Sequence, residues 1–185
     1  MAVLLCQIPR MQVERLDEMR ITSKDEAQIG ALLDAAFNTE FGGRSYYQQR
    51  HHVRLIVRNA DVIVGHMAIS LRAIRMGDAL VQVAGLAEVA TDPDRRGQGI
   101  ASTLMNAAIV EAQASPAAFF VLFGDQPLYA ASGFVAKTNL LRYSSFLGVQ
   151  SGEVIDAAKD GLMVMSLRDE LWDDTAVIDL VGHAF

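Results

Sequence analysis

The sequence has almost no cysteine and no long hydrophobic run. Its only cysteine, Cys6, cannot form an intramolecular disulfide and excludes a multi-cysteine zinc site, so a reducing cytoplasm is the simplest compartment. The longest apolar run, residues 117–123, is far shorter than the roughly 20 residues of a membrane-spanning helix. Residues 1–10 contain an apolar patch but no basic start and no clear cleavage site, so we expect no secretory signal.

Positive charge is also scarce. The chain has 16 lysines and arginines against 22 acids, a net charge of −6, which argues against nucleic acid as the main partner. The excess of acidic residues is not spread evenly along the chain. Residues 1–150 carry 14 acidic and 14 basic side chains, whereas residues 151–185 carry 8 acidic and 2 basic ones. Such a segment is either a solvated acidic tail or the source of a field that attracts a cationic substrate.

What the sequence does have is enough apolar material for a core. The chain is 185 residues long, with 51% hydrophobic and 21% charged residues, which is typical of a folded globular protein. A chain of this length buries roughly 70% of its unfolded surface without the help of disulfides or metals. We therefore expect a single domain over residues 1–185, with an N-terminal extension over 1–11 and a C-terminal acidic segment over 144–185.

In the first part of the chain, the apolar periodicity predicts a helix followed by antiparallel strands. Ser23, with Glu26 three residues later, is a capping box, and it opens an amphipathic helix. A strand is expected before this helix, over residues 12–19, and a short helix or loop after it, over residues 45–50. Turn residues then separate three strands of an antiparallel meander, at residues 53–58, 61–74 and 79–91.

After residues 92–94, the spacing of apolar residues changes from the two-residue period of a strand to the period of a helix. A helix is predicted over about residues 97–113, and it ends before Pro116. Residues 117–123 are apolar on both faces, as in a central parallel strand. Gly133 is a favourable residue after the C-terminus of a short helix. The elements expected at the end of the chain are this helix over 128–132, a strand from Phe134, an irregular connection over 144–158 and a last strand over 161–167.

The most informative segment lies between the expected strand 79–91 and the helix 97–113. Two arginines and two glycines stand at the mouth of that helix, where N–H groups are unpaired and an anion can approach the backbone closely. The Walker phosphate loop is excluded, because it needs Gly-Lys-Ser/Thr at its end. The dinucleotide fingerprint is excluded too, because Ser102 stands where it needs a third glycine. The segment therefore predicts an anion site of another kind.

This segment resembles the pyrophosphate loop of the GNAT N-acetyltransferase superfamily, Arg/Gln-x-x-Gly-x-Gly/Ala, with Arg96, Gly99 and Ala101 at its defined positions. Residues 128–134, Leu-Tyr-Ala-Ala-Ser-Gly-Phe, are similar to that superfamily's Leu-Tyr-x-x-x-Gly-Phe element, and the order of strands and helices agrees over most of residues 12–140. The resemblance implies an α/β (α+β) GNAT fold. Its sheet would be mixed but mostly antiparallel, with about six to seven strands, about four flanking helices and splayed strands at the acyl-CoA site.

By this resemblance, the chain is expected to use acetyl-CoA as a co-substrate, with no metal, and to transfer the acetyl group to an amine by direct attack on the thioester. Glu88 has the position of the family's general base and Tyr129 that of its general acid. Taken without the resemblance, Glu88 is a surface carboxylate at a strand end and Tyr129 a core tyrosine. The residues expected to bind acetyl-CoA are Val89, Ala90, Thr91, Arg95, Arg96, Gly97, Gln98, Gly99, Ile100, Ala101 and Ser102.

The histidines and the cysteine do not predict a site of their own. His51 and His52 are adjacent, so in a strand they face opposite ways, and neither has a second ligand at metal spacing. We interpret them as surface or pocket-lining residues, and His66, in the middle of a strand, as a satisfied core residue. Cys6 is too isolated to predict a nucleophile, and direct transfer of the acetyl group does not need one.

The resemblance also bears on the acceptor. Residues 66–89 are similar to the aminoglycoside 2'-N-acetyltransferases and to the nodulation acyltransferases, which both act on amino sugars. This implies a primary amine of a small molecule, with Glu40, Asp179 and the carboxylate of Phe185 at the acceptor site and the C-terminal segment completing that site and the sheet.

Other acceptors and other functions stay open. Arg44 brings a cation into a segment of the acceptor site where a polyamine needs anions, so an acid-bearing or neutral acceptor or a protein N-terminus is an alternative. A sensor that binds acyl-CoA, an inactive member of the fold, and an interaction protein that dimerises through its apolar strands are the further alternatives. A homodimer with no nucleic-acid or membrane partner is expected.

Overall fold

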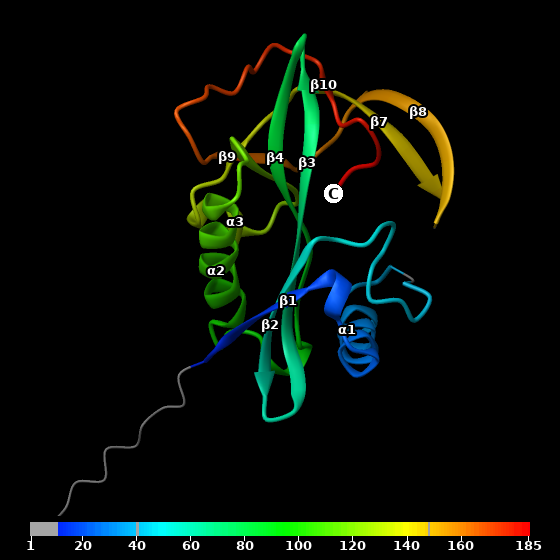
Figure 1. The fold of residues 1–185 in the computed structure, drawn as a ribbon, viewed down its shortest axis with the longest axis vertical. Helices are drawn as coiled ribbons and strands as arrows, with labels where there is room; N and C mark the ends of the chain where they lie inside the picture. Colours follow the sequence, from blue (N-terminus) through cyan, green and yellow to red (C-terminus); the bar gives the residue numbers. More distant parts are fainter. Residues whose placement is uncertain (1–10, 40, 148) are drawn as a thin grey trace, which may run out of the picture.

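A computed structural model describes residues 11–39, 41–147 and 149–185 of the chain. Most of these residues belong to regular elements (Figure 1). The helices are η1 (Glu18–Arg20), α1 (Ser23–Ala36), η2 (Pro93–Arg95), α2 (Ile100–Ala114) and α3 (Pro127–Ala131). The strands are β1 (Val13–Asp17), β2 (Val53–Asn59), β3 (Val62–Met76), β4 (Ala79–Thr91), β5 (Phe119–Phe123), β6 (Val135–Ala136), β7 (Leu140–Leu147), β8 (Gln150–Ala158), β9 (Leu162–Ser166) and β10 (Ile178–Asp179).

The strands in the described residues form one ten-stranded sheet. Its main path runs β6-β9-β5-β4-β3-β10-β7-β8, and β2 pairs with β3 and carries β1 on its other edge. The pairs β4–β5 and β10–β7 are parallel, and the other pairs are antiparallel. The expected α/β fold with a mixed, mostly antiparallel sheet is therefore confirmed, with ten strands in the described residues in place of the expected six to seven.

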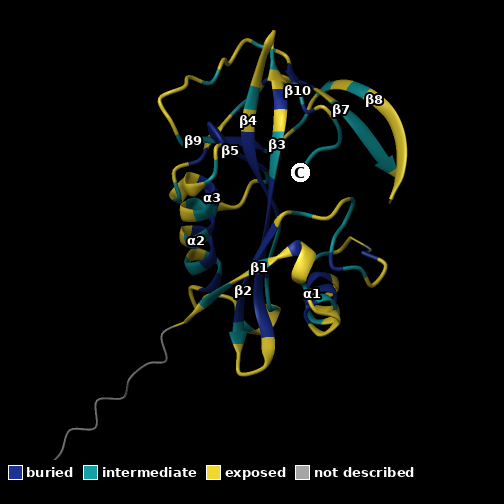
Figure 2. Ribbon diagram, viewed as in Figure 1, coloured by how far each residue is buried: buried dark blue, intermediate teal, exposed yellow. Residues whose placement is uncertain are grey.

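Helices cover the two faces of the central strands (Figure 1). On one face, α2 packs Ile100, Leu104 and Ala108 onto apolar residues of β2, β3 and β4. On the opposite face, α1 packs Ile29 and Leu33 against the same strands. The strands between the helices are the most deeply buried part of the molecule (Figure 2), because both of their faces are covered.

The predicted start of the first helix is displaced by one residue. Thr22, not Ser23, is the N-cap, because it keeps an extended backbone (φ −83°, ψ 154°) while Ser23 is already helical. The Thr22 hydroxyl accepts a hydrogen bond from the Asp25 backbone N–H (3.1 Å) and donates one to the Asp25 carboxylate (2.7 Å). This reciprocal pairing satisfies an N–H of the first turn.

The irregular connection predicted over residues 144–158 is wrong. Residues 144–147 and 150–158 belong to a hairpin in which β7 pairs with β8, and Arg142 bridges to Asp156 across it at 2.7 Å. Both faces of β8 are largely exposed, so its sequence lacks the alternation of apolar and polar residues that indicates a half-buried strand. The strand at 161–167 is not the last one either, because the two-residue strand β10 follows and pairs with β3 and β7.

None of the helices in the described ranges is long and apolar enough to cross a membrane.

Candidate functional site

The central strands separate at one point of the sheet. The parallel ladder between β4 and β5 covers only Val83–Gly85 and Phe119–Val121. Beyond Gly85, the register of β4 on β3 shifts, so that Glu88 and Val89 together face a single residue of β3. Glu88 has φ +52°, the left-handed conformation that accompanies such a bulge. Because the bulge directs β4 away from β5, the edge of β4 that faces β5 is free for another extended chain.

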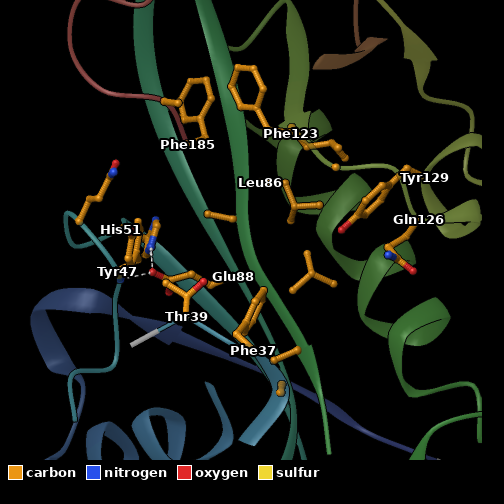
Figure 3. A pocket seen from close by; sticks show the side chains of 18 of the residues that line it. Phe37, Thr39, Tyr47, His51, Leu86, Glu88, Phe123, Gln126, Tyr129 and Phe185 are labelled. Atoms are coloured by element: carbon orange, nitrogen blue, oxygen red, sulfur yellow. Dashed lines mark hydrogen bonds and ion pairs between the residues drawn. The ribbon is translucent and has the colours of Figure 1, made fainter. Parts of the chain in front are cut away.

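A cavity of about 880 Å³ lies along this opening. One side of it, the donor wall, is formed by the end of β4, the glycine loop, the start of α2 and α3, and includes Thr91, Arg96, Ala101 and Tyr129. The other side, the acceptor wall, carries six ring side chains, namely Phe37, Phe41, Tyr47, His51, His183 and Phe185. Figure 3 shows Glu88 between these groups, with His51 and Tyr47 beside it and Tyr129 across β4.

The Glu88 carboxylate is buried and held from several directions. Its Oε1 accepts a hydrogen bond from the backbone N–H of Tyr47 (2.7 Å) and lies 3.1 Å from Nε2 of His51. Its Oε2 accepts a hydrogen bond from Nη1 of Arg54 (2.8 Å). Burial opposes ionisation, but the contact with His51 and the charge of Arg54 outweigh it and hold the pKa of Glu88 below its usual range. Glu88 is therefore ionised at neutral pH.

Arg54 connects Glu88 to the floor of the site. The Arg54 side chain is completely buried, and it pairs with Glu18 through two hydrogen bonds of 2.6 and 3.1 Å. Its Nη1 also donates to the backbone carbonyl of Ser45 at 2.7 Å. Burial raises the pKa of Glu18, but the hydrogen bonds and charge of Arg54, with the hydrogen bond from Arg50, together outweigh it and lower that pKa. Sequence analysis missed Arg54, although a lone cation within the apolar run 53–57 is itself a signal of a buried ion pair.

The two histidines next to Glu88 have different roles. His66 is fully buried, donates a hydrogen bond from Nδ1 to the Glu88 carbonyl (2.9 Å), and accepts one from Arg54 at Nε2 (3.3 Å). Burial and the charge of Arg54 lower the pKa of His66 to about 3, so it is neutral, as expected for a satisfied core residue. His51 instead lines the cavity, and its Nδ1 shares a hydrogen bond of 3.1 Å with the hydroxyl of Ser70. The contact of His51 with Glu88 is not aligned as a hydrogen bond, which leaves Nε2 of His51 without a bonded partner.

Tyr129 lies on α3, at the opposite side of the opening from Glu88 (Figure 3). Its ring packs over Gly124, where a Cβ atom would come within 2.6 Å of it, and edge-on to Phe134. Burial, with a smaller effect from Asp125, raises the pKa of Tyr129, so the phenol keeps its proton at neutral pH. This is the protonation state that a proton donor needs.

The glycine loop leads into the start of α2. Gly97 and Gly99 have φ +78° and +81°, and a Cβ atom on either one would meet nothing within 4 Å. The first hydrogen bond of the helix runs from the Thr103 N–H to the Gly99 carbonyl, so the N–H groups before Thr103 have no helical partner. Unpaired N–H groups at a helix start, with open space beside Gly97 and Gly99, are the features that an anion-binding site requires.

The expected acetyl-CoA residues divide into four groups. Val89, Ala90, Thr91, Arg96 and Ala101 line the cavity. The Ile100 side chain is buried against Gly65 in the core, so only its backbone N–H can take part. Arg95 is turned toward Asp92, with its Nε 3.4 Å from that carboxylate. The remaining residues, Gly97, Gln98, Gly99 and Ser102, are exposed at the loop and the first turn of α2.

Of the residues expected to hold the acceptor, the structure describes Phe185 and Asp179, and only Phe185 lines the cavity. Asp179 lies in β10, and its carboxylate accepts a hydrogen bond from the Val181 N–H (2.8 Å). Glu40 lies outside the described residues, as does Cys6. Within the described ranges, no group of three or more histidine, cysteine, aspartate or glutamate residues could hold a metal ion.

Comparison with known proteins identifies the class of this fold and site. The family model described as acetyltransferase (GNAT) domain matches residues 19–135, which is more than half of the chain. The chain therefore belongs to the GNAT family of acetyltransferases, as the glycine loop and the Leu-Tyr-x-x-x-Gly-Phe element predict. No curated protein matches the chain significantly.

Solved structures agree with this fold at low sequence identity. The GNAT family N-acetyltransferase YhbS from Escherichia coli, solved in complex with CoA, has a TM-score of 0.61 and 21% identity, covering 93% of this chain and 91% of that one. A GNAT family acetyltransferase from Brucella melitensis, in complex with acetyl-CoA, has a TM-score of 0.57 and 19% identity, covering 90% and 95%. The ribosomal-protein-S18-alanine N-acetyltransferase from Escherichia coli has a TM-score of 0.56 and 16% identity, covering 88% of this chain and 100% of that one.

Proposed function

We propose that this protein transfers an acetyl group from acetyl-CoA to a primary amine of a small molecule. The observation that carries the proposal is the cavity at the divergence of β4 and β5, with the ionised Glu88 and the protonated Tyr129 on its two sides. Acetyl-CoA, when bound, supplies a thioester that is susceptible to attack by an amine. The YhbS and Brucella structures hold CoA and acetyl-CoA, which supports the same donor here.

The donor wall supplies the groups that such a co-substrate requires. The backbone N–H groups from Arg96 to Ala101 would bind the pyrophosphate, and the side chain of Arg96 adds a positive charge beside them. The free edge of β4 near Val89 and Ala90 would pair with the extended pantetheine arm. These are roles for residues of one continuous segment, which explains why they are recognisable in the sequence.

The proposed base and acid roles follow from the ionised state of Glu88 and the protonated state of Tyr129. Glu88 would accept the proton that the ammonium form of the acceptor loses. Nε2 of His51 lies 3.1 Å from the Glu88 carboxylate, makes no aligned hydrogen bond, and would help to orient the amine. Tyr129 would donate a proton to the departing thiolate. Positioning of the amine by the acceptor wall would contribute much of the remaining rate.

We further propose that the protein acts in the cytoplasm and as a homodimer. The single cysteine supports a reducing compartment. A light-scattering measurement of molar mass in solution tests the dimer, and a mass of 20.1 kDa, that of one chain, would contradict it.

Calorimetric titration with acetyl-CoA, followed by a thiol-release assay over a panel of amines and peptides, tests the proposed function. Binding together with thiol release in the presence of one class of amine is the expected result. Binding without release by any acceptor would favour an acyl-CoA sensor. Release with peptides alone would favour a protein or peptide amine as the acceptor, and absence of binding would contradict the proposal.

A further inference from the structure

Acetylation of a primary ammonium group removes two protons from the acceptor nitrogen. The ammonium form carries three hydrogens on nitrogen, whereas the amide product carries one. One proton must leave before the nitrogen can attack a thioester, because an ammonium has no free lone pair, and the other leaves once the C–N bond forms. The Glu88 carboxylate holds one proton at a time, and Tyr129 acts as a donor. Glu88 must therefore pass on the first proton before it can take the second.

His51 lies next to Glu88, where it can receive that first proton. Nε2 of His51 is 3.1 Å from Oε1 of Glu88, and Figure 3 shows the two side chains beside each other. Both residues line the cavity, and both side chains are more than nine-tenths buried, with exposed fractions of 8% and 6%. A proton on Glu88 can therefore reach Nε2 without entering bulk water, once a small rotation aligns the two atoms.

Ser70 of β3 determines which nitrogen of the His51 ring carries the hydrogen. Nδ1 of His51 and Oγ of Ser70 are 3.1 Å apart, and either atom can donate. A hydrogen on Nε2 would be a buried N–H without an aligned acceptor among the described residues, which is costly. A hydrogen on Nδ1, donated to Ser70, avoids this cost. The neutral ring then presents the lone pair of Nε2 to Glu88.

The partners of Glu88 favour release of the proton to His51. Burial opposes ionisation, but the contact with His51 and the charge of Arg54 hold the pKa of Glu88 below its usual range. An imidazole is in general a stronger base than a carboxylate, so it is the better resting place for the proton. His66 cannot take this role, because its Nδ1 donates to the Glu88 carbonyl and its Nε2 accepts from Arg54.

The other groups around His51 are compatible with a positive charge on its ring. The charged and titratable groups that interact with His51 or with Glu88 are Glu18 of η1, Arg54 of β2, His66 of β3 and His183 near the C-terminus. Arg54 is paired with Glu18 at 2.6 Å as well as with Glu88. Burial, with a neighbouring arginine, lowers the pKa of His66 to about 3 and that of His183 to about 4, so both are neutral. The imidazolium of His51 would therefore face the carboxylate of Glu88 as its ion-pair partner.

We infer that His51 is a positioning residue of acetyl transfer, which receives through Nε2 the first proton that Glu88 takes from the acceptor and so frees Glu88 for the second. This inference rests on the proposed acetyl transfer and deepens the account of the same site. The first N–H bond of the ammonium breaks, and its proton moves to Glu88 and then to His51. The neutral amine attacks the thioester, and Glu88 takes the second proton as the amide forms. Tyr129 protonates the departing sulfur. One of the two protons then restores Tyr129, and the other leaves to solvent.

The first test compares two amines of nearly equal size in the thiol-release assay at pH 8. 2-Phenylethylamine is mostly an ammonium at this pH and has two protons to lose. 2,2-Difluoro-2-phenylethylamine is mostly neutral, because its fluorines withdraw electrons from the nitrogen, and has one to lose. We expect His51→Gln to lower kcat/KM about tenfold for 2-phenylethylamine and less than about twofold for the difluoro amine. An equal loss for both amines would indicate a purely structural role and overturn the inference, as would no loss for either.

His52→Gln is the matched control for this comparison. His52 is adjacent in sequence but exposed, and its Nδ1 accepts a hydrogen bond from the Leu71 backbone N–H (3.1 Å) rather than facing Glu88. We expect unchanged kcat/KM for both amines in this variant. The dissociation constant of acetyl-CoA, measured by calorimetry, should stay within about twofold in His51→Gln, because the donor wall is unchanged.

A second measurement needs no turnover. Ring-nitrogen NMR follows the protonation of the histidines with pH, and the signals of His51 are those absent from His51→Gln. Because the Glu88 carboxylate stabilises a charge on Nε2, we expect His51 to take up its proton about one pH unit lower in Glu88→Gln than in the wild type. An unchanged midpoint would overturn the inference whatever the activity. Absence of acetyl-CoA binding by the wild type would instead contradict the proposed function itself.

Discussion

The two walls of the cavity are built in opposite ways. The donor wall comes largely from consecutive residues, the end of β4, the glycine loop and the start of α2, and it offers backbone N–H groups and an open strand edge. The acceptor wall is assembled from two distant segments, the connection between α1 and β2 and the C-terminus, and it lies beside a buried charge network. Binding through the backbone suits a donor common to a family, whereas binding through side chains allows the acceptor to differ between members.

The largest effect is expected when Arg54, which supports the acceptor wall, is replaced, and it is an effect on the free energy of unfolding. Arg54→Met leaves the buried Glu88 without its arginine partner and Glu18 with only the more exposed Arg50, so we expect the free energy of unfolding to fall by about 3–5 kcal/mol. Urea denaturation measures this change. Arg75→Met, an exposed arginine on β3, is the control, with an expected change within about 0.5 kcal/mol. An Arg54→Met protein as stable as the wild type would show that the network does not hold the wall.

Glu88→Gln is expected to lower the rate of acetyl transfer without changing the affinity for acetyl-CoA. The amide has the same size but cannot accept a proton, so kcat/KM for the amine is expected to fall about 100- to 1,000-fold. The dissociation constant of acetyl-CoA should stay within about twofold, because the donor wall is unchanged. Steady-state thiol release and calorimetry measure the two quantities, and Glu153→Gln on the exposed strand β8 is the control. Equal activity of the Glu88→Gln and wild-type proteins would remove Glu88 from the mechanism.

The pH dependence of stability tests two histidines, the buried His66 and the half-buried His183 of the acceptor wall. The pKa values of His66 and His183 are lowered to about 3 and about 4, while an unfolded histidine titrates near 6.5. Between about pH 6.5 and 4, the unfolded chain therefore binds more protons than the folded one. The free energy of unfolding should then fall on acidification, by up to about 1.4 kcal/mol per pH unit for each histidine.

Urea midpoints at pH 7, 6 and 5 measure this slope. His183→Gln is expected to reduce the slope, and His52→Gln, at an exposed position, should leave it unchanged. Identical midpoints across this range in the wild type would contradict the assignment of both histidines as neutral in the folded state.

The smallest expected effect concerns the donor wall. Gly99→Val introduces a branched side chain at φ +81° into the open space of the glycine loop, and we expect the dissociation constant of acetyl-CoA to rise about tenfold. The relative kcat/KM values for different amines should not change. Gly77→Ala is the control for backbone strain, because Gly77 has φ +58° in the turn between β3 and β4, away from the cavity lining. A shift in amine preference with unchanged donor affinity would reverse the assignment of the walls.

Sequence reasoning was accurate where the signal is local. The meander β2–β3–β4, the helix α2 and the buried strand β5 follow from periodicity and turn residues, and the structure confirms them within a few residues. The hairpin β7–β8 was missed because it is exposed on both faces and shows no alternation. The buried Arg54 was missed because its partners, Glu18 and Glu88, are 36 and 34 residues away.

The sequence by itself determined the donor side of this protein, because a glycine loop at a helix start carries its geometry in consecutive residues. Only the tertiary structure decided the acceptor side. It directs the C-terminal acids to turns and surface ion pairs, and it places Phe185 on Gly85 at the opening between β4 and β5. The physical reason is that side-chain packing and buried charge pairs join residues far apart in the chain. The spacing of such residues in the sequence does not indicate that they are in contact.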